Sequence, residues 1–382
     1  MISTPLIPPQ RNLFDLPRDT CYLNAAYMGP MPNAAVTAGQ ESYARKGQPW
    51  NYQVQPDFFD APERLRAQAA RLFGASADDI ALVPAASYGL ATAARNLAPD
   101  SGSEILVLAE QFPSNVYVWR DLAAEHGASV RTVTRSDNQS WTEAVLATIS
   151  SATSIVACPQ LHWVDGGALD LAAISDAARR QGAALVLDLT QSLGILPFDL
   201  AAIQPDFAVA AGYKWLLGPY AMGYLYVAPH HQGGEPLEQN WIVRDRAEDF
   251  TRLVDYADDH APGARRFDMG ERSNFQLVPA ASASLDAMLD WGAYALVATL
   301  GRTNLQLAER LAPLGLREAT PDRAPHYLSL SLPDNAPSDL LALLAAQKIF
   351  VSQRGDRLRI TPHVYNDEAD FQRFASALET LL

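Results

Sequence analysis

The fold that we expect for this chain follows from one stretch, AALVLDLTQSLGILPFDLAAIQPDFAVAAGYKWLLGPYAMGYLYVA at residues 183–228. Three apolar runs of strand length occur here, at 183–189, 206–211 and 222–228, and the first contains Asp188 while Lys214 follows the second. Near-continuous apolar strands are typical of a parallel sheet that is covered on both faces. Ligands of such sheets bind beyond the carboxyl ends of the strands, so both charges lie where a ligand is expected.

The alternation of strands and helices continues toward the N-terminus. Further strands are expected at 103–109, 129–133 and 154–158, and helices at 61–73, 114–126, 141–149 and 170–181. This order indicates an α/β fold with a mostly parallel sheet.

A smaller α+β domain is expected after the polar connection at 230–265. Its predicted elements are a helix at 277–311, strands at 327–332, 349–352 and 357–361, and a helix at 367–382 capped by Asn366 or Asp367. We therefore expect three parts: an N-terminal segment 1–25 that packs with the small domain and the active site, a large domain 26–262, and a small domain 263–382.

Composition and charge exclude several classes of protein. The chain has 382 residues, of which 48% are apolar and 19% charged, a balance typical of compact folded proteins. Its net charge of −14 has the wrong sign for binding phosphate backbones or anionic lipid. We expect neither a nucleic-acid partner nor a membrane partner.

The cysteines are too few for a disulfide framework, a cysteine zinc site or an iron–sulfur cluster, since only Cys21 and Cys158 occur. We expect no metal at the site. The start of the chain lacks a secretory pattern, and no apolar run is long enough to span a membrane. We therefore expect a cytoplasmic protein.

Lys214 is one of only three lysines among 29 basic residues, and it stands in the apolar, glycine-bounded stretch GYKWLLGP. A buried lysine loses its proton readily and then condenses with an aldehyde. Pyridoxal 5′-phosphate (PLP) supplies such an aldehyde, and a carboxylate such as Asp188 would keep its pyridine nitrogen protonated. Taken alone, Lys214 could equally reach solvent, and Asp188 and Gln191 could cap a helix.

Several further stretches occur in a characteristic order: YLNAAYMGPMP at 22–32, VPAASYGLATAARNL at 83–97, EQFPSNVYVW at 110–119, CPQLHWVDGG at 158–167, FDMGERSNF at 267–275 and RLRITPHVYNDEADF at 357–371. With GYKW, they resemble the class V aminotransferase family of fold-type I PLP enzymes, which also contains cysteine desulfurases, kynureninases and isopenicillin N epimerase. The resemblance implies a seven-stranded, mostly parallel sheet in the large domain and a homodimer with active sites at the subunit interface.

The resemblance also implies roles for particular residues. Lys214 is expected to form the Schiff base and to carry the α-proton. The expected cofactor contacts are Ala86, Ser87, Phe112, Trp163, Asp188, Gln191, Tyr213, Ser273 and Asn274, the last two reaching the neighbouring subunit's phosphate. The expected substrate contacts are Ala26, His162 and Arg359, and the family pattern selects Arg359 over Arg357, which strand alternation places on the same face.

The reaction stays open between several outcomes. A desulfurase of this family carries a nucleophilic cysteine ahead of the carboxylate-binding arginine, and residues 312–356 contain none. We expect an aminotransferase acting on a small α-amino acid. The alternatives are a C–S lyase without a catalytic cysteine, a kynureninase- or epimerase-like activity suggested by Phe112-Pro113-Ser114 and Tyr213-Lys214, and a binding or regulatory domain without activity.

Overall fold

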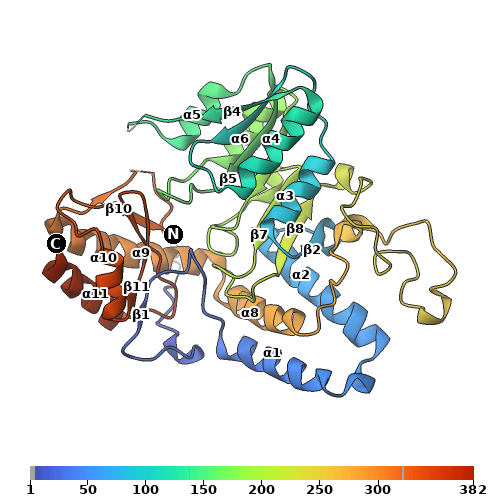
Figure 1. The fold of residues 1–382 in the computed structure, drawn as a ribbon, viewed down its shortest axis with the longest axis horizontal. Coiled ribbons are helices and arrows are strands. Elements are labelled where there is room, and N and C mark those ends of the chain that lie inside the picture. The colour runs from blue at the N-terminus through green and yellow to red at the C-terminus, as the bar shows by residue number, and fades with distance from the viewer. Residues whose placement is uncertain (1–4, 137, 321) are drawn as a thin grey trace.

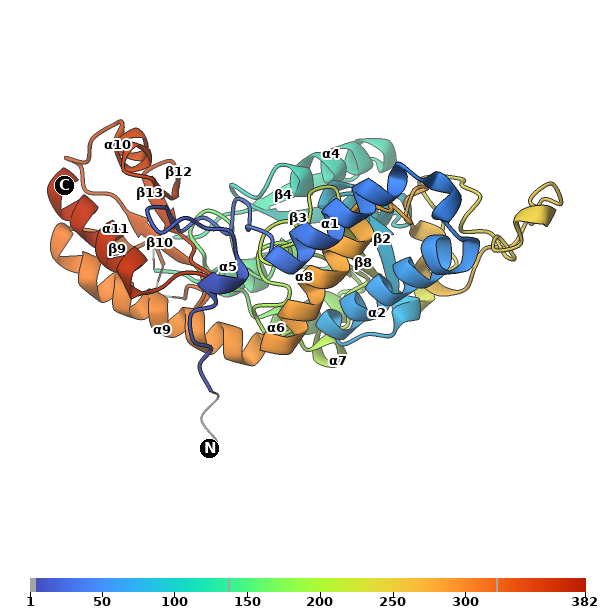
Figure 2. The same cartoon turned by 90° about the horizontal axis from the view of Figure 1, so that it is seen from below.

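The chain folds into a large domain around one sheet and a smaller domain beside it (Figure 1). The computed structural model describes residues 5–136, 138–320 and 322–382. Residues 5–46, which are called the N-terminal segment from here on, contact both domains: β1 (Cys21–Tyr22) pairs with β11 (Ile349–Phe350) of the small domain. The helix α1 (Asn33–Lys46) at the end of this segment packs on α8 (Leu277–Trp291) of the large domain (Figure 2).

The large sheet has seven strands, and all run parallel except the second in the order. In spatial order they are β2 (Ile80–Val83), β8 (Gly223–Val227), β7 (Phe207–Ala211), β6 (Ala184–Asp188), β5 (Thr153–Pro159), β3 (Glu104–Leu108) and β4 (Ser129–Val133). The predicted α/β fold with a mostly parallel sheet is thereby confirmed. The short strand β2 was not predicted, because four apolar residues carry little periodicity.

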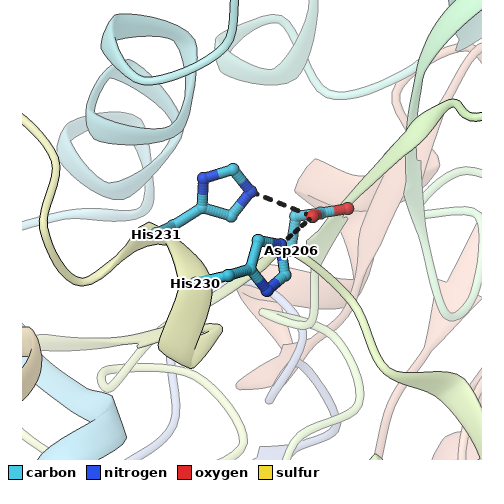
Figure 3. Close-up of side chains that lie close together, drawn as sticks. All are labelled: Asp206, His230 and His231. Carbon is cyan, nitrogen blue, oxygen red and sulfur yellow. Dashed lines mark hydrogen bonds and ion pairs between the residues drawn. The ribbon is translucent and has the colours of Figure 1, made fainter.

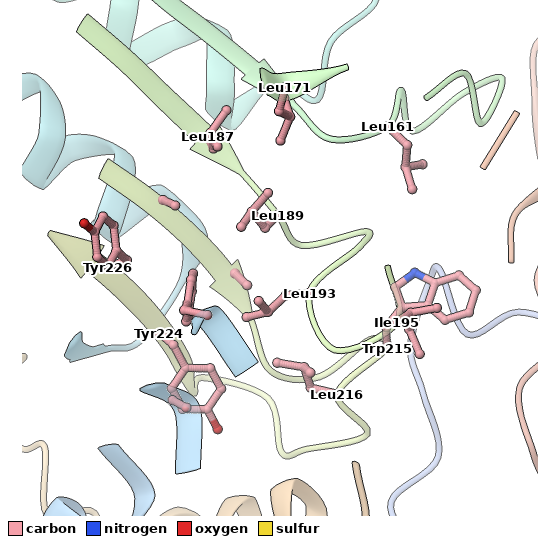
Figure 4. Close-up of a cluster of buried hydrophobic side chains, with 14 of the residues drawn as sticks. Leu161, Leu171, Leu187, Leu189, Leu193, Ile195, Trp215, Leu216, Tyr224 and Tyr226 are labelled. Atoms are coloured by element: carbon pink, nitrogen blue, oxygen red, sulfur yellow. The ribbon is translucent and has the colours of Figure 1, made fainter. Parts of the chain in front are cut away.

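Helices cover both faces of this sheet, and side chains along each strand alternate between the two. Ile105 and Val107 of β3 face the core under α3 and α4, whereas Leu106 and Leu108 face the core on the other side. Figure 4 shows part of this second core, which contains Leu187. The helices of the large domain are α1, α2 (Ala61–Phe73), α3 (Ala86–Arg95), α4 (Ser114–His126), α5 (Trp141–Thr148), α6 (Leu171–Arg180), α7 (Leu200–Ile203) and α8.

The small domain has a core of its own. Its antiparallel sheet has the order β12 (Ser352–Arg354), β13 (Arg357–Ile360), β10 (Leu328–Ser331) and β9 (Arg317–Glu318), and its helices are α9 (Ala293–Leu311), α10 (Leu340–Ala346) and α11 (Glu368–Leu381). Asp367 caps α11 by accepting a hydrogen bond from the amide of Asp370. Cys21 and Leu23 of the N-terminal segment join this core.

The predicted long helix 277–311 is wrong, because the chain forms two helices that meet at Gly292. This glycine has φ 74° and ψ 141°, a conformation that breaks the helix and favours glycine. Val278, Leu285 and Met288 of α8 pack into the core of the large domain. Leu296 and Leu300 of α9 join the same core, so the expected boundary between the two domains at residue 263 stays a prediction.

Within the described parts of the chain, no helix combines the length and apolar character needed to cross a membrane.

Candidate active site

A cavity of about 220 Å³ opens at the carboxyl-terminal edge of the large sheet. The ends of β5, β6 and β7 contribute Pro159, Asp188 and Ala211 to its wall, and the start of α3 contributes Ala86 and Ser87. A second hollow shares Phe112, Trp163, Tyr213, Lys214 and Tyr220 with it and adds Ala26, Arg354 and Arg359 from the N-terminal segment and the small domain. The site therefore lies where the two domains and the N-terminal segment meet.

Lys214 lies in the loop that follows β7, and it is only 7% exposed. Burial lowers the pKa of its ammonium group from 10.5 to about 8, and the Arg359 and Arg354 charges act in the same direction, whereas Asp188 opposes them. Its Nζ lies 5.2 Å from the ring centre of Phe112 and 5.6 Å from that of Tyr213. A substantial fraction of Lys214 is therefore neutral near pH 8, as a nucleophile or base requires.

The loop around Lys214 is held in place from the N-terminal segment. The amide of Gly29 donates a hydrogen bond to the carbonyl of Tyr213 at 2.9 Å. A Cβ atom at position 29 would clash with the carbonyl oxygen of Lys214. Only glycine permits this close approach of the two backbones.

Asp188 is the last residue of β6 and lines the cavity together with Thr190 and Gln191. Its Oδ1 accepts a hydrogen bond from the Thr190 amide at 3.0 Å. The Gln191 side chain donates to the carbonyl of Ala26 at 3.1 Å and accepts from the Trp215 indole at 2.8 Å. Gln191 therefore ties the cavity wall to the N-terminal segment, while Asp188 keeps a carboxylate directed to the site.

The start of α3 offers an anion site. The N-cap residue of this helix is Ala85, whose side chain has no oxygen that could cap the helix. No side-chain oxygen of the N-cap therefore binds the first amides of α3, at Ala86 and Ser87. Both residues line the cavity. Free amides and the helix dipole favour a phosphate at this position.

Aromatic rings form the opposite wall. Phe112 and Trp163 meet edge to face, with ring centres 5.4 Å apart and an angle of 88° between the planes. The Trp163 indole donates a hydrogen bond to the carbonyl of Glu110 at 2.6 Å, which fixes its orientation. Phe112 is 37% exposed, so its ring has a free face that a planar ligand could cover.

Two arginines of the small domain reach the same hollow. Arg359 of β13 is 1% exposed, and its guanidinium donates to Ser352 Oγ at 2.8 and 3.0 Å and to the carbonyl of Trp163 at 2.9 Å. Arg354 of β12 lies 5.2 Å from the Trp163 ring centre. Among the described residues, no carboxylate forms an ion pair with either arginine.

Two polar groups in the wall have no protein partner among the described residues. They are Asn115 Nδ2 and Gln111 Oε1, both buried in side chains that line the cavity. A buried unpaired donor and acceptor favour a bound polar ligand. With the anion site at α3, the carboxylate of Asp188 and the buried Lys214, they fit the phosphate, ring nitrogen and aldehyde of PLP.

Three predicted site residues lie away from the cavity. His162 is 1% exposed and turns its ring inward, with Nε2 3.0 Å from the carbonyl of Ala109 and Nδ1 3.3 Å from Asp165. This geometry gives it a structural role in place of the expected substrate contact. Ser273 donates to the carbonyl of Phe58, and Asn274 caps α8, so neither lines the cavity of its own chain. Their expected contact with a neighbouring subunit stays a prediction.

The sequence analysis missed several residues of the cavity, which are Gln111, Asn115, Thr190, Tyr220 and Arg354. Gln111 and Asn115 flank Phe112 within the quoted stretch 110–119, so their polar character next to a strand end was an available signal. Arg354 and Tyr220 carried no such signal, since many other arginines and tyrosines occur.

The chain belongs to the aminotransferase class-V family, because the sequence model of that family matches residues 21–375. It is 32% identical to the kynureninase of Deinococcus radiodurans over 74% of this chain and 67% of that protein. It is 27% identical to the uncharacterised aminotransferase YcbU of Bacillus subtilis over 88% and 87% of the two chains.

The fold matches that of C-DES, solved as a mutant with glycine covalently linked to its PLP cofactor. The TM-score is 0.88 at 20% identity, covering 98% of this chain and 100% of that one. The predicted family and the predicted cofactor are thereby confirmed, and the protein is an enzyme of the PLP-dependent class V family.

Proposed function

We propose that this protein is an aminotransferase that exchanges the amino group of an α-amino acid through Lys214. The observation that carries the proposal is the buried Lys214, with its pKa lowered to about 8, in one site with Asp188 and the unpaired Arg359. When bound, PLP supplies an electron sink for negative charge at the substrate's α-carbon. The chain's own residues then have to hold the two molecules and move a proton.

Holding the cofactor falls to four groups of this chain. The amides at the start of α3 would bind the phosphate, and the Asp188 carboxylate would stabilise a protonated ring nitrogen. Phe112 would stack on the ring, and the unpaired side-chain amide of Asn115 would offer a hydrogen-bond donor to the cofactor. Because Phe112 has no proton to exchange, proton transfer is left to Lys214.

Holding the substrate falls to Arg359. Ser352 and the carbonyl of Trp163 orient its guanidinium but leave its charge uncompensated. A substrate carboxylate would supply that charge, and bidentate binding by the guanidinium would fix the orientation of the substrate's α-carbon in the site. In its neutral form the Lys214 amine removes the α-proton, and in its protonated form it returns a proton.

A second candidate function is a C–S lyase, and Arg354 favours it. Arg354 lies beside Arg359 without an ion-pair partner among the described residues, so this site has charge for a second carboxylate. C-DES is described as a cystine C–S lyase, and cystine carries two carboxylates. A dicarboxylic amino acid would use the same two arginines in transamination.

A desulfurase with a catalytic cysteine is disfavoured. Cys21 and Cys158 are the only cysteines, and burial raises the pKa of each thiol to about 12. Neither thiol is in reach of a substrate, since both side chains are at most 1% exposed. A kynureninase-like activity has support from likeness to several kynureninases, including that of Deinococcus radiodurans, and from Phe112-Pro113-Ser114 and Tyr213-Lys214.

We further propose a homodimer in which the loop with Ser273 and Asn274 reaches the neighbouring subunit's phosphate. Sedimentation of the purified holoenzyme tests this arrangement. A monomer that is fully active would contradict it.

The reaction is tested with the holoenzyme and separate solutions of alanine, aspartate, glutamate, cystine and kynurenine, each with and without a 2-keto acid. Transfer of the amino group that requires the keto acid supports the aminotransferase. Pyruvate and a persulfide released from cystine without an acceptor indicate the lyase, and anthranilate released from kynurenine indicates kynureninase activity. Arg354→Gln is expected to slow turnover of aspartate, glutamate or cystine by about tenfold or more while leaving alanine within about twofold.

A further inference from the structure

Asp206, His230 and His231 form a cluster at the end of the large sheet opposite to Lys214. Asp206 precedes β7, and the two histidines lie in the short 3₁₀ turn after β8, which runs antiparallel to β7. The start of one strand and the end of the other therefore meet at this edge. The active site described above lies at the other end of β7, so the cluster belongs to a different surface.

Both imidazoles converge on one carboxylate oxygen (Figure 3). Nε2 of His230 lies 2.9 Å and Nε2 of His231 3.0 Å from Asp206 Oδ1. Depending on its tautomer, Nε2 presents either a hydrogen or a lone pair along this same direction. A cation bound by all three atoms would take one lone pair from each Nε2 and from Oδ1, once the imidazole rings turn from the carboxylate oxygen toward the ion.

The separations fit a metal ion. Ligand bonds of about 2.0–2.2 Å meeting at about 90° place neighbouring donor atoms about 3 Å apart, and tetrahedral angles need only a few tenths of an ångström more. The three donor atoms lie within 4.8 Å of one another. A shift of the exposed His230 ring is enough to open the cluster around an ion, because its side chain is 66% exposed.

The other two proposed ligands, Asp206 and His231, are already held in position by neighbouring groups. Asp206 Oδ2 accepts a hydrogen bond from the Leu185 amide at 2.7 Å, which orients the carboxylate toward the histidines. The His231 ring lies against Phe207, with ring centres 4.8 Å apart. Such supporting contacts fix the orientation of metal ligands.

Arg179 is the cationic side chain that lines the same hollow as Asp206 and the two histidines, and it is bound to other residues. Arg179 of α6 donates to Gln204 Oε1 at 2.7 Å and to Asp176 at 2.5 Å. Among the described residues, Asp206 contacts no lysine or arginine in an ion pair, and its side-chain partners are the two histidines. A divalent ion would meet one carboxylate and two neutral imidazoles, with the remaining positions open to water.

We propose that Asp206, His230 and His231 bind one divalent transition-metal ion, such as Zn²⁺ or Ni²⁺, as a structural site that joins the ends of β7 and β8. Two imidazoles with one carboxylate favour borderline transition metals over Mg²⁺ or Ca²⁺, which prefer oxygen ligands. The sequence analysis expected no metal, since it searched for cysteine ligands and did not consider the adjacent histidines.

The test uses tag-free holoenzyme stripped with a chelating resin, because a polyhistidine tag would bind the same ions. Equilibrium dialysis against Zn²⁺ and, separately, Ni²⁺ is followed by elemental analysis of the protein. We expect one ion per chain with a dissociation constant on the order of micromolar. The double variant His230→Gln, His231→Gln should bind about 100-fold more weakly, whereas the control His126→Gln should bind like the wild type.

A second measurement separates this site from metal bound at the cofactor. Cu²⁺ bound by the wild type should give an electron paramagnetic resonance spectrum with splitting from two imidazole nitrogens, and the double variant should lose it. Saturating Zn²⁺ should raise the melting temperature of the wild type by a few degrees and leave that of the double variant unchanged. No saturable uptake at 100 µM metal, or equal uptake by the double variant, would overturn the proposal and leave the cluster as a hydrogen-bonded clamp.

Discussion

Two buried cations of the large domain, Lys214 and Arg66, differ in what lies next to them. Arg66 of α2 is completely buried, and its guanidinium contacts Asp268 in a bidentate pair with distances of 2.6 and 2.9 Å. Burial opposes its charge, but Asp268 and Glu63 outweigh that cost, so the pKa of Arg66 lies above its ordinary value. Lys214 has no carboxylate in contact among the described residues, and burial lowers its pKa to about 8.

The same fold thus holds a permanently charged, structural side chain at Arg66 and a reactive one at Lys214. A contacting carboxylate keeps a buried cation permanently charged, as at Arg66. Without that contact, desolvation favours the neutral form, as at Lys214. Arg359 is a third case, since it is buried and its hydrogen-bond partners, Ser352 and the carbonyl of Trp163, are neutral.

The largest effect is expected when the reactive cation is removed. Lys214→Ala should lower turnover by about 10⁴-fold or more, because the chain loses both its covalent link to PLP and its proton carrier. Steady-state kinetics with the preferred substrate measure the loss. The surface variant Lys46→Ala serves as the control and should keep wild-type turnover. Lys214→Ala with more than a tenth of normal activity would contradict the role of this lysine.

Removing the carboxylate of Asp268, the partner of Arg66, is expected to lower the stability of the protein. Asp268→Ala leaves the Arg66 charge without its bidentate partner and the Leu82 amide without an acceptor, and should reduce the free energy of unfolding by about 3–5 kcal/mol. Urea unfolding measures it. Asp176→Ala breaks the exposed pair with Arg179 and should cost less than about 1 kcal/mol. An equal loss of unfolding free energy in Asp268→Ala and Asp176→Ala would show that a buried ion pair stabilises this protein no more than an exposed one.

A third expectation concerns pH. Between pH 8 and about 10.5 the unfolded chain keeps the Lys214 proton that the folded chain has lost, so raising the pH favours the folded state. The stability of wild-type apoprotein relative to Lys214→Met should therefore rise with pH by up to about 3 kcal/mol across this window. Below pH 8 Lys214→Met should be the more stable protein. A difference that is constant with pH would mean that the lysine is not desolvated.

The smallest of these four effects is expected when the third cation, Arg359, is removed. Arg359→Leu should lower kcat/KM by about 100-fold, mainly through weaker substrate binding, because the substrate carboxylate loses its bidentate partner. Arg357→Leu is the matched control on the same strand. Its side chain lies outside the cavity and donates to the carbonyl of Ala319 at 3.4 Å. Equal losses in both variants would contradict the choice of Arg359.

The local parts of the site were open to prediction. Lys214 and Asp188 were found because a rare lysine and a carboxylate follow apolar strands. The anion site at Ala86 and Ser87 follows from a helix that begins after a strand, although the resemblance to a family was needed to select it. Strand alternation alone could not separate Arg359 from Arg357, and the side chain of Arg359 is held in the cavity wall by Ser352 of a neighbouring strand and by Trp163 of the large domain.

Other residues depended on contacts between distant segments. His162 was expected in the site, but its Nε2 hydrogen-bonds to the carbonyl of Ala109 and its Nδ1 lies next to the Asp165 carboxylate inside the fold. The break at Gly292 was missed because apolar periodicity continues through it. Arg354 gains its place beside Arg359 only when the small domain's strands pair.

Periodicity in the sequence was enough to predict most strands and helices of the large domain, the mostly parallel sheet, and the lysine and carboxylate at its ligand-binding edge. These features depend on side-chain periodicity and on chain direction, which are local properties. The tertiary structure alone decided which cations are charged, which arginines enter the cavity, and that Asp206 meets His230 and His231. Desolvation and pairing depend on groups that approach from distant parts of the chain, and only the folded arrangement brings those groups into contact.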